Sequence, residues 1–306
     1  MNKLVVLGSV NADHVLQVPT FPRPGETLIG RNYQVIAGGK GANQAVAAAR
    51  LGADIGFIAC VGNDPFGLNI IESFKKDGIN TDFITIVPNI PTGIAMIQVS
   101  DDGENCICLS PEANNALNQT CTSLYEAAIQ QAEYLLLQLE TPLDGIESAV
   151  KHAKKENNTK VVLNPAPAKA LPDSLLKQID IITPNETEAE LLTGICVTDN
   201  LSAKQAADAL HAKGVSTVMI TLGSKGVWLS ECGKGSNIQG FKVQAIDTTA
   251  AGDTFNGALV TALIEGMKIQ EAIRFAHAAA AISVTRFGAQ TSIPTRQEVE
   301  SFLQAH

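Results

Sequence analysis

The stretch Asp247–Gly257 combines small residues and an acidic side chain in an order that suits phosphoryl transfer. The small residues Ala250–Gly252 lead into the apolar run Ala258–Ile264, which predicts a helix that begins at this turn. A helix N-terminus has unpaired N–H groups that attract phosphate, and small residues allow close approach. Asp253 stands in the first turn, so its carboxylate could take a proton from a hydroxyl that attacks the phosphate. An ordinary helix cap is an equally good interpretation of Asp253.

A second cluster, Gly38–Ala45, is glycine-rich and precedes a predicted helix. It is not a Walker A loop, because Gly41 stands where Ser or Thr is needed and Gln34 where the first Gly is needed. The dinucleotide fingerprint Gly-x-Gly-x-x-Gly is missing from the sequence. Lys40 and Asn43 in the first turn suit hydrogen bonds to a polyhydroxyl ligand, although a loop with a solvated lysine is the commoner outcome for such a pattern.

Polar side chains also stand at the ends of predicted strands. Asn11 and Asp13 come just after the apolar run Lys3–Val10, and Glu140 comes after Tyr134–Leu139. Ligands of open α/β sheets bind beyond the carboxyl ends of the strands, so these residues are candidates for a binding site. Asn and Asp are also ordinary turn residues, which leaves the assignment open.

An acidic segment follows the predicted strand Ile179–Thr183. Asn185 and Glu188 supply oxygen atoms that could hold hydrated Mg²⁺. Acids in a first helical turn also stabilise the helix itself, so this pattern has a purely structural alternative.

Short β-branched runs alternate with helical stretches along most of the chain. This alternation predicts an α/β fold with a central, mostly parallel sheet and helices on both faces. The predicted strands are Lys3–Val10, Asp54–Cys60, Tyr134–Leu139, Lys160–Leu163, Ile179–Thr183 and Thr217–Thr221. The predicted helices are Ala42–Leu51, Gly67–Asp77, Ser123–Gln131, Leu143–Lys155, Glu186–Leu192, Ser202–Lys213, Ala251–Glu265, Ile269–Thr285 and Thr295–Leu303.

Two stretches break the alternation. Val15–Ala37 is proline-rich without a helical period, and Thr92–Leu109 reads as a hairpin that is apolar on both faces. A free hairpin should not expose two apolar faces to water. We therefore expect a single domain over residues 1–306 whose lid, built from about 15–37 and 92–109, has one face over the site and the other against a partner. The alternative is an edge extension of the main sheet.

Composition excludes several classes of protein. The 306 residues are 45% hydrophobic and 17% charged, which indicates a folded chain, and the formal charge of −9 disfavours binding to nucleic acid or an anionic membrane. No apolar run reaches the roughly 18 residues of a membrane helix, and the polar residues after Val10 argue against a signal peptide. We therefore expect a cytoplasmic protein. The scattered cysteines and histidines predict neither disulfides nor a zinc site.

Taken together, four motifs resemble those of the ribokinase-like (PfkB) carbohydrate kinases, over residues 3 to about 294. They are Gly38-Gly39-Lys40-x-x-Asn43-x-Ala45, Asn185-x-x-Glu188, Thr221-Leu222-Gly223-Ser224-Lys225-Gly226 and Asp247-Thr248-x-Ala250-Ala251-Gly252-Asp253-x-Phe255. Within the family, the stretches 7–14, 38–48 and 164–168 are most similar to members that act on D-ribose. Ala250 departs from the Gly that the wider family usually has there, but members that act on ribose tolerate Ala.

This resemblance implies an ATP-dependent kinase that phosphorylates the 5-hydroxyl of D-ribose. Asp253 would act as the base, and the backbone of Ala250, Ala251 and Gly252 would form the anion hole. The implied sugar contacts, besides Asp253, are Asn11, Asp13, Gly39, Lys40, Asn43 and Glu140.

The same resemblance implies two cations and a nucleotide site. Asn185 and Glu188 would order Mg²⁺, through water, and the triphosphate of ATP. The implied nucleotide contacts are Asn185, Thr221, Leu222, Gly223, Ser224, Lys225, Gly226, Gly252 and His277. The implied K⁺ contacts, several through backbone carbonyls, are Asp247, Thr249, Ser283, Arg286, Gly288 and Ser292. Lids of this family often form the contact of a homodimer.

Three other functions were weighed. A related kinase that acts on 2-deoxyribose or a nucleoside stays open, because Asn11 and Asp13 favour a vicinal diol without excluding a sugar that lacks one hydroxyl. A non-catalytic sugar-binding protein would have no use for Asp253 beside an anion hole. An NAD-dependent dehydrogenase lacks its glycine fingerprint.

Overall fold

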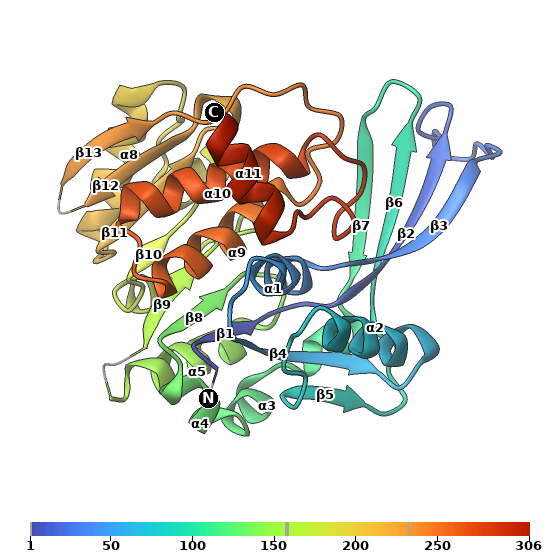
Figure 1. The fold of residues 1–306 in the computed structure, drawn as a ribbon. Helices are drawn as coiled ribbons and strands as arrows, with labels where there is room; N and C mark the ends of the chain where they lie inside the picture. Colours follow the sequence, from blue (N-terminus) through green and yellow to red (C-terminus); the bar gives the residue numbers. More distant parts are fainter. Residues whose placement is uncertain (1, 157–158, 232) are drawn as a thin grey trace.

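The computed structural model describes residues 2–156, 159–231 and 233–306, and it confirms the predicted alternation of strands and helices (Figure 1). Within these ranges the main sheet has nine strands in the order β13-β12-β11-β10-β9-β8-β1-β4-β5. Their bounds are β1 (Leu4–Leu7), β4 (Ile55–Gly62), β5 (Ile84–Val87), β8 (Tyr134–Leu137), β9 (Lys160–Leu163), β10 (Ile181–Ile182), β11 (Thr217–Thr221), β12 (Val227–Glu231) and β13 (Lys234–Ile238).

The main sheet is parallel from β5 to β11 and antiparallel at its other end, where β12 and β13 pair. The short strand β5 and this terminal pair were not predicted. Lys234–Ile238 is mostly polar and half-exposed, so it lacks the apolar run by which the buried parallel strands were found.

Helices cover both faces of the main sheet, as predicted. Alternate residues of β1 enter different cores: Leu4 and Val6 pack in one cluster, and Val5 and Leu7 in the other. The first face carries α1 (Lys40–Arg50), α2 (Pro65–Lys76), α9 (Ala251–Ile264), α10 (Ile269–Ser283) and α11 (Arg296–Ala305). The second face carries α3 (Gln119–Ser123), α4 (Glu126–Gln131), α5 (Leu143–Lys154), α6 (Asp173–Leu176), α7 (Glu186–Thr193) and α8 (Asn200–Ala212).

A separate four-stranded sheet stands beside one end of the main sheet (Figure 1). Its order is β3 (Arg31–Gly38), β2 (Asn11–Val18), β6 (Gly93–Ser100) and β7 (Asn105–Ser110). The predicted hairpin over 92–109 is therefore confirmed as part of a second sheet, and the edge-extension alternative is wrong.

Two details of that prediction need correction. The stretch 15–37, expected to be irregular, holds most of β2 and β3, because its prolines are confined to the turn between these strands. Asn11 and Asp13 do not lie in a loop after β1. The first strand ends at Leu7, and after a short break both residues belong to β2 of the small sheet.

Strand β1 marks the point where the order of the main sheet reverses. It pairs with β4 on one side and β8 on the other, and ligands of open α/β sheets bind in the crevice that such a reversal creates. The chain leaves this end of β1, enters the small sheet and returns into α1, so both sheets meet at the crevice.

Helices α1 and α9 approach each other closely at Gly257. A Cβ atom there would lie 2.7 Å from both the carbonyl oxygen of Gln44 and the Cβ of Ala47, so only glycine allows this packing. The contact brings the first turn of α9, with Asp253, against the first turns of α1.

Candidate active site

A hollow of about 210 Å³ opens at the crevice between the helix N-termini and the carboxyl ends of the strands. It unites residues from the four sequence motifs. They are Lys40, Asn185, Glu188, Thr221, Thr248, Ala250, Ala251, Gly252 and Asp253. The other lining residues, Asn164, Ala166, Thr183 and Asn256, were not predicted as site residues. Position gave a signal for two of them, because Asn164 directly follows β9 and Thr183 directly follows β10.

The N-terminus of α9 has the geometry of an anion site. Ala250 precedes the helix with φ of 58°, a left-handed conformation that normally favours glycine. Among the described residues, no acceptor takes the backbone N–H groups of Gly252 and Asp253. These donors and the positive end of the helix dipole line the hollow, so the turn can hold a phosphate.

The carboxylate of Asp253 is buried and bound by α1. Asn43 Nδ2 donates to Asp253 Oδ2 at 3.0 Å, and Gln44 Nε2 donates to Asp253 Oδ1 at 2.9 Å. The side chain does not cap its own helix, so the cap interpretation has no support in this structure. Gln44 was not predicted as a site residue, because its partner lies 209 residues away in the chain.

Asn11 and Asp13 share one face of β2, and neither lines the hollow. Asp13 is buried, its Oδ1 has no hydrogen-bond partner among the described residues, and burial raises the pKa of its carboxyl to about 7, helped by the charges of Glu140 and Asp253. Asn11 is held by Asn114, whose Nδ2 donates to Asn11 Oδ1 at 2.8 Å. That contact leaves the Asn11 amide N–H groups free for a ligand, and Asp13 offers an acceptor beside them.

Glu140 closes the N-terminus of α1. Its Oε2 accepts from the backbone N–H of Lys40 at 2.9 Å and from the Ser9 hydroxyl. Gly39 precedes the helix with φ of 92°, where a side chain would strain the backbone. Lys40 points into the hollow, and the carboxylate of Asp253, ahead of those of Glu140 and Glu188, raises the pKa of its ammonium.

Asn185 and Glu188 form a capping box on α7. Asn185 Oδ1 accepts from the N–H of Glu188 at 2.8 Å, and Glu188 Oε2 accepts from the N–H of Asn185 at 2.9 Å. The structural alternative for this motif is thus present, yet both residues also line the hollow. Across the described ranges, no cluster of three or more His, Cys, Asp or Glu could hold a metal ion.

The predicted nucleotide residues are only partly brought together. Thr221 lies at the end of β11 and lines the hollow, whereas Gly223–Lys225 form an exposed 3₁₀ turn beyond it. His277 on α10 is buried against Phe255, with ring centroids 5.5 Å apart. Burial lowers the pKa of His277 to about 4, so the imidazole is neutral at physiological pH.

The predicted K⁺ residues come from two segments that Asp247 ties together. Asp247 Oδ1 accepts from the backbone N–H of Thr249 at 2.9 Å, and Asp247 Oδ2 accepts from that of Gly288 at 2.9 Å. Ser283 and Ser292 stand a few residues before and after Gly288 in the sequence, and both are fully buried. Each donates its hydroxyl hydrogen to a backbone carbonyl oxygen. The Arg286 guanidinium instead pairs with Glu298 at 2.6 Å, so only its backbone is available to an ion.

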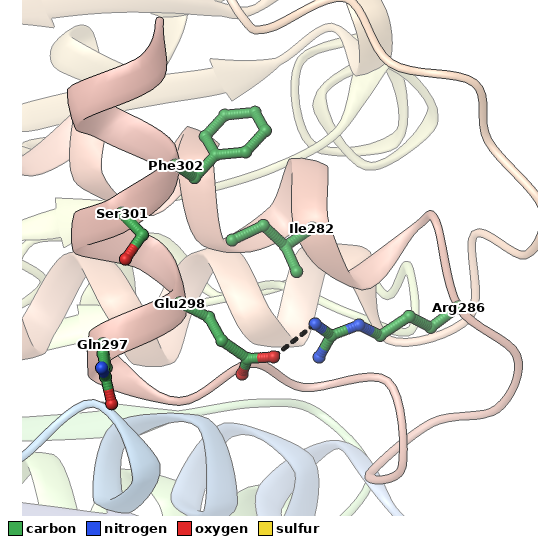
Figure 2. Close-up of a pocket in the computed structure, with 6 residues that line it drawn as sticks. All are labelled: Ile282, Arg286, Gln297, Glu298, Ser301 and Phe302. Atoms are coloured by element: carbon green, nitrogen blue, oxygen red, sulfur yellow. Dashed lines mark hydrogen bonds and ion pairs between the residues drawn. The ribbon is translucent and has the colours of Figure 1, made fainter.

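That ion pair lies in a larger hollow of about 470 Å³ against α11, which Figure 2 shows. Its lining residues are Ile282, Arg286, Gln297, Glu298, Ser301 and Phe302. Apart from Arg286, none of these lining residues belongs to a predicted site. The positive charge of the Arg286 guanidinium is already balanced by Glu298. The smaller hollow at the helix N-termini is therefore the candidate active site.

Comparisons with known proteins agree with this location. The profile of the pfkB family carbohydrate kinases matches residues 1–296. The ribokinase of Haemophilus influenzae is 60% identical over 98% of both chains, and the deoxyribokinase of Salmonella typhi is 34% identical over 98% of both. The structure of Arabidopsis thaliana ribokinase complexed with ribose and ATP superposes with a TM-score of 0.93, at 37% identity over 99% of both chains.

Within the described ranges, no helix is both long and apolar enough to cross a membrane.

Asp13→Asn should stabilise the unliganded protein, and more so at high pH. An unfolded Asp ionises near pH 3.8 but folded Asp13 near 7, so the folded state binds an extra proton between these values and stability falls as pH rises through that window. Asn carries no such penalty. The gain in the free energy of unfolding from Asp13→Asn should therefore be about 2 kcal/mol larger at about pH 8 than at about pH 5.5. Thermal denaturation of both proteins at both pH values measures this gain, with the exposed Asp82→Asn as control. An equal effect of Asp13→Asn at both pH values would refute the raised pKa.

Proposed function

Because this chain belongs to the pfkB family of carbohydrate kinases, we propose that it transfers the terminal phosphoryl group of ATP to the 5-hydroxyl of D-ribose. The products are D-ribose 5-phosphate and ADP. The observation that carries this function is the buried carboxylate of Asp253 beside the free N–H groups of an α-helix N-terminus. An acceptor for a proton and a site for a transferring phosphoryl group are the two parts that such a reaction needs.

The small sheet supplies the sugar contacts in this proposal. Asn11 donates to the ring hydroxyls and Asp13 accepts from them. Gly39, Lys40, Asn43 and Glu140 would add contacts from outside the small sheet, and of these four Lys40 also lines the hollow. Asp13 lacks a partner for Oδ1, and Asn43 lacks one for its own Oδ1, among the described residues. Sugar hydroxyls would satisfy both buried atoms, which would otherwise cost about 1–3 kcal/mol each.

The chemical step uses residues of α9. Asp253 takes the proton of the 5-hydroxyl as the hydroxyl oxygen attacks the phosphorus. Within the predicted anion hole Ala250–Gly252, the N–H of Ala251 is bonded to the Thr248 carbonyl, so the free N–H of Gly252, together with that of Asp253, stabilises the charge on the transferring phosphoryl oxygens. Lys40 faces the same hollow with a positive charge that suits the phosphates. The nucleotide lies along Thr221–Gly226, with the neutral ring of His277 nearby.

Two cations complete the proposal, and the residues present fit both. Glu188 keeps one carboxylate oxygen free of the capping box, which suits a hydrated Mg²⁺ that binds mainly to the triphosphate. Asp247, Thr249, Ser283, Arg286, Gly288 and Ser292 offer a carboxylate, hydroxyls and backbone carbonyls, all oxygen donors suited to K⁺. When bound, Mg²⁺ shields the charge of the phosphates, and K⁺ supports the turn at Ala250–Gly252.

The small sheet is proposed to act as a lid of a single domain over residues 1–306 and as the contact of a homodimer. His14, Val35 and Met96 pair across three strands and so share the face opposite Asp13, and Tyr33 and Cys108 extend it. Val35, Met96 and Tyr33 are 42%, 56% and 60% exposed. Exposed apolar side chains that cluster on a sheet favour burial against a partner subunit. A sedimentation experiment that showed only the monomer would exclude the homodimer.

The acceptor is tested by ADP release in a coupled assay with ribose, 2-deoxyribose, fructose and adenosine. If Asp13 accepts from two hydroxyls, loss of one bond to a charged group costs roughly 1.5–3 kcal/mol. Ribose should then exceed 2-deoxyribose in kcat/KM by about tenfold or more. Equal values would refute the role of Asp13, and a preference for 2-deoxyribose or adenosine would establish the related activity instead.

Asp253→Asn should nearly abolish turnover while it leaves ribose affinity largely intact. Asn is almost isosteric and can still hydrogen-bond the 5-hydroxyl, but it cannot take the proton, so kcat should fall by about 10²–10⁴-fold. Calorimetry measures ribose binding and the coupled assay measures kcat on the same folded protein, with the exposed Asp208→Asn as a control. A kcat within about threefold of the parent value would show that Asp253 is not the base.

Potassium should raise both activity and thermal stability above the values in sodium or tetramethylammonium at equal ionic strength. An ion at Asp247 would order the turn that directly precedes the anion site. Asp247→Asn should remove the K⁺-dependent rise in melting temperature together with the activation. Rates and melting temperatures that are indifferent to the cation would count against the site.

A further inference from the structure

We propose that Gln44 is a positioning residue for the catalytic base: its amide holds the Asp253 carboxylate, and Gln138 holds that amide in the required orientation. This inference rests on the proposed role of Asp253 in phosphoryl transfer. It concerns two buried side chains, neither of which the sequence motifs assign to any role.

Gln44 lies in the second turn of α1 and is fully buried. Its Nε2 atom lies 2.9 Å from Asp253 Oδ1 and 3.0 Å from Asn164 Oδ1, so its two N–H bonds have separate acceptors. Asn43 binds the other oxygen of the same carboxylate at 3.0 Å. With one amide donor on each oxygen, the plane of the carboxylate is fixed.

The orientation of the Gln44 amide follows from a backbone carbonyl, which can only accept. Asn164 binds the carbonyl oxygen of Thr183 at 3.3 Å, so its amide nitrogen must face that atom and its oxygen must face Gln44. Gln44 must therefore present nitrogen to Asn164 and oxygen to the opposite side. Gln138 Nε2 donates to that oxygen at 2.7 Å and completes the chain.

The series of hydrogen bonds continues from Thr183 to the turn that precedes Asp253. The Thr183 hydroxyl donates to Asn256 Oδ1 at 2.7 Å, and Asn256 Nδ2 donates to the carbonyl oxygen of Gly252 at 2.8 Å. The base and the anion-site turn are thus tied to one buried network. Both oxygens of Asp253 accept hydrogen bonds from amide N–H groups, so the network holds this side chain in a single orientation.

Charged groups face Asp253 from several elements. Lys40 lies on α1, Asp13 on β2 and Glu188 on α7, and each interacts electrostatically with Asp253. Without the Gln44 donor, the carboxylate would be held on one side only and free to turn toward Lys40.

The test is Gln44→Met, which keeps the length of the side chain and removes the donor. Loss of one hydrogen bond to a charged group should lower kcat by about 10–100-fold. The KM for ribose should stay within about threefold, because Gln44 makes no hydrogen bond to Asn11 or Asp13, the proposed contacts to the ring hydroxyls.

Thr159→Val serves as a matched control for lost stability. Thr159 is buried at the start of β9, and its hydroxyl binds the carbonyl oxygens of Ile129 and Ala132, away from the site. This variant should have a lower melting temperature and an unchanged kcat. A fall in kcat that Thr159→Val reproduced at equal loss of stability would overturn the positioning role.

Gln138→Met covers the case in which Gln44→Met does not fold. Gln138 touches Gln44 but not Asp253, so kcat should fall by a smaller factor, about 3–10-fold, with an unchanged KM for ribose. Variants with the parental kcat, in a protein that phosphorylates ribose and loses activity in Asp253→Asn, would overturn this inference alone. A parent protein that does not phosphorylate ribose would instead overturn the proposed function.

Discussion

The close contact between α1 and α9 is the constraint on which the site depends. Gly257 lets the two helices approach until Asn43 and Gln44 reach the carboxylate of Asp253. The same contact sets the N-terminus of α9 beside Lys40, and both line one hollow together with residues that follow β9 and β10. The arrangement of the strands thus determines where the site lies. The absence of a side chain at Gly257 determines how closely α1 and α9 approach each other.

Four carboxylates gather around that place, those of Asp13, Glu140, Glu188 and Asp253, and Lys40 interacts electrostatically with the last three. Each has a different environment: Asp13 has almost none of the usual partners, Glu140 and Glu188 bind helix N–H groups, and Asp253 binds amides. Burial raises the pKa of the Asp13 carboxyl to about 7 and also raises that of the Glu188 carboxyl.

The elements could be predicted from sequence far better than the contacts between them. Strands such as Lys160–Leu163 and Thr217–Thr221 match the structure to the residue, because a buried parallel strand is a continuous apolar run. The small sheet was predicted only in part, because β2 and β3 flank a proline-rich turn. Gln44 was not predicted, because a hydrogen bond between residues 209 apart in the chain leaves no local sequence pattern. Asn185 shows that a residue of one motif can cap a helix and line a site at the same time.

Two of the proposed sugar contacts and the residues proposed for phosphoryl transfer come from different parts of the chain. Asn11 and Asp13, the proposed contacts to the acceptor, stand on a sheet made of two segments, 11–38 and 93–110, whereas Asp253 and the turn before it belong to the main sheet's own helices. The small sheet contributes none of the residues that line the hollow. Under the proposed function, changes in those two segments would alter the sugar contacts that Asn11 and Asp13 make, while Asp253, the turn before it and the sugar contacts on α1 stayed in place.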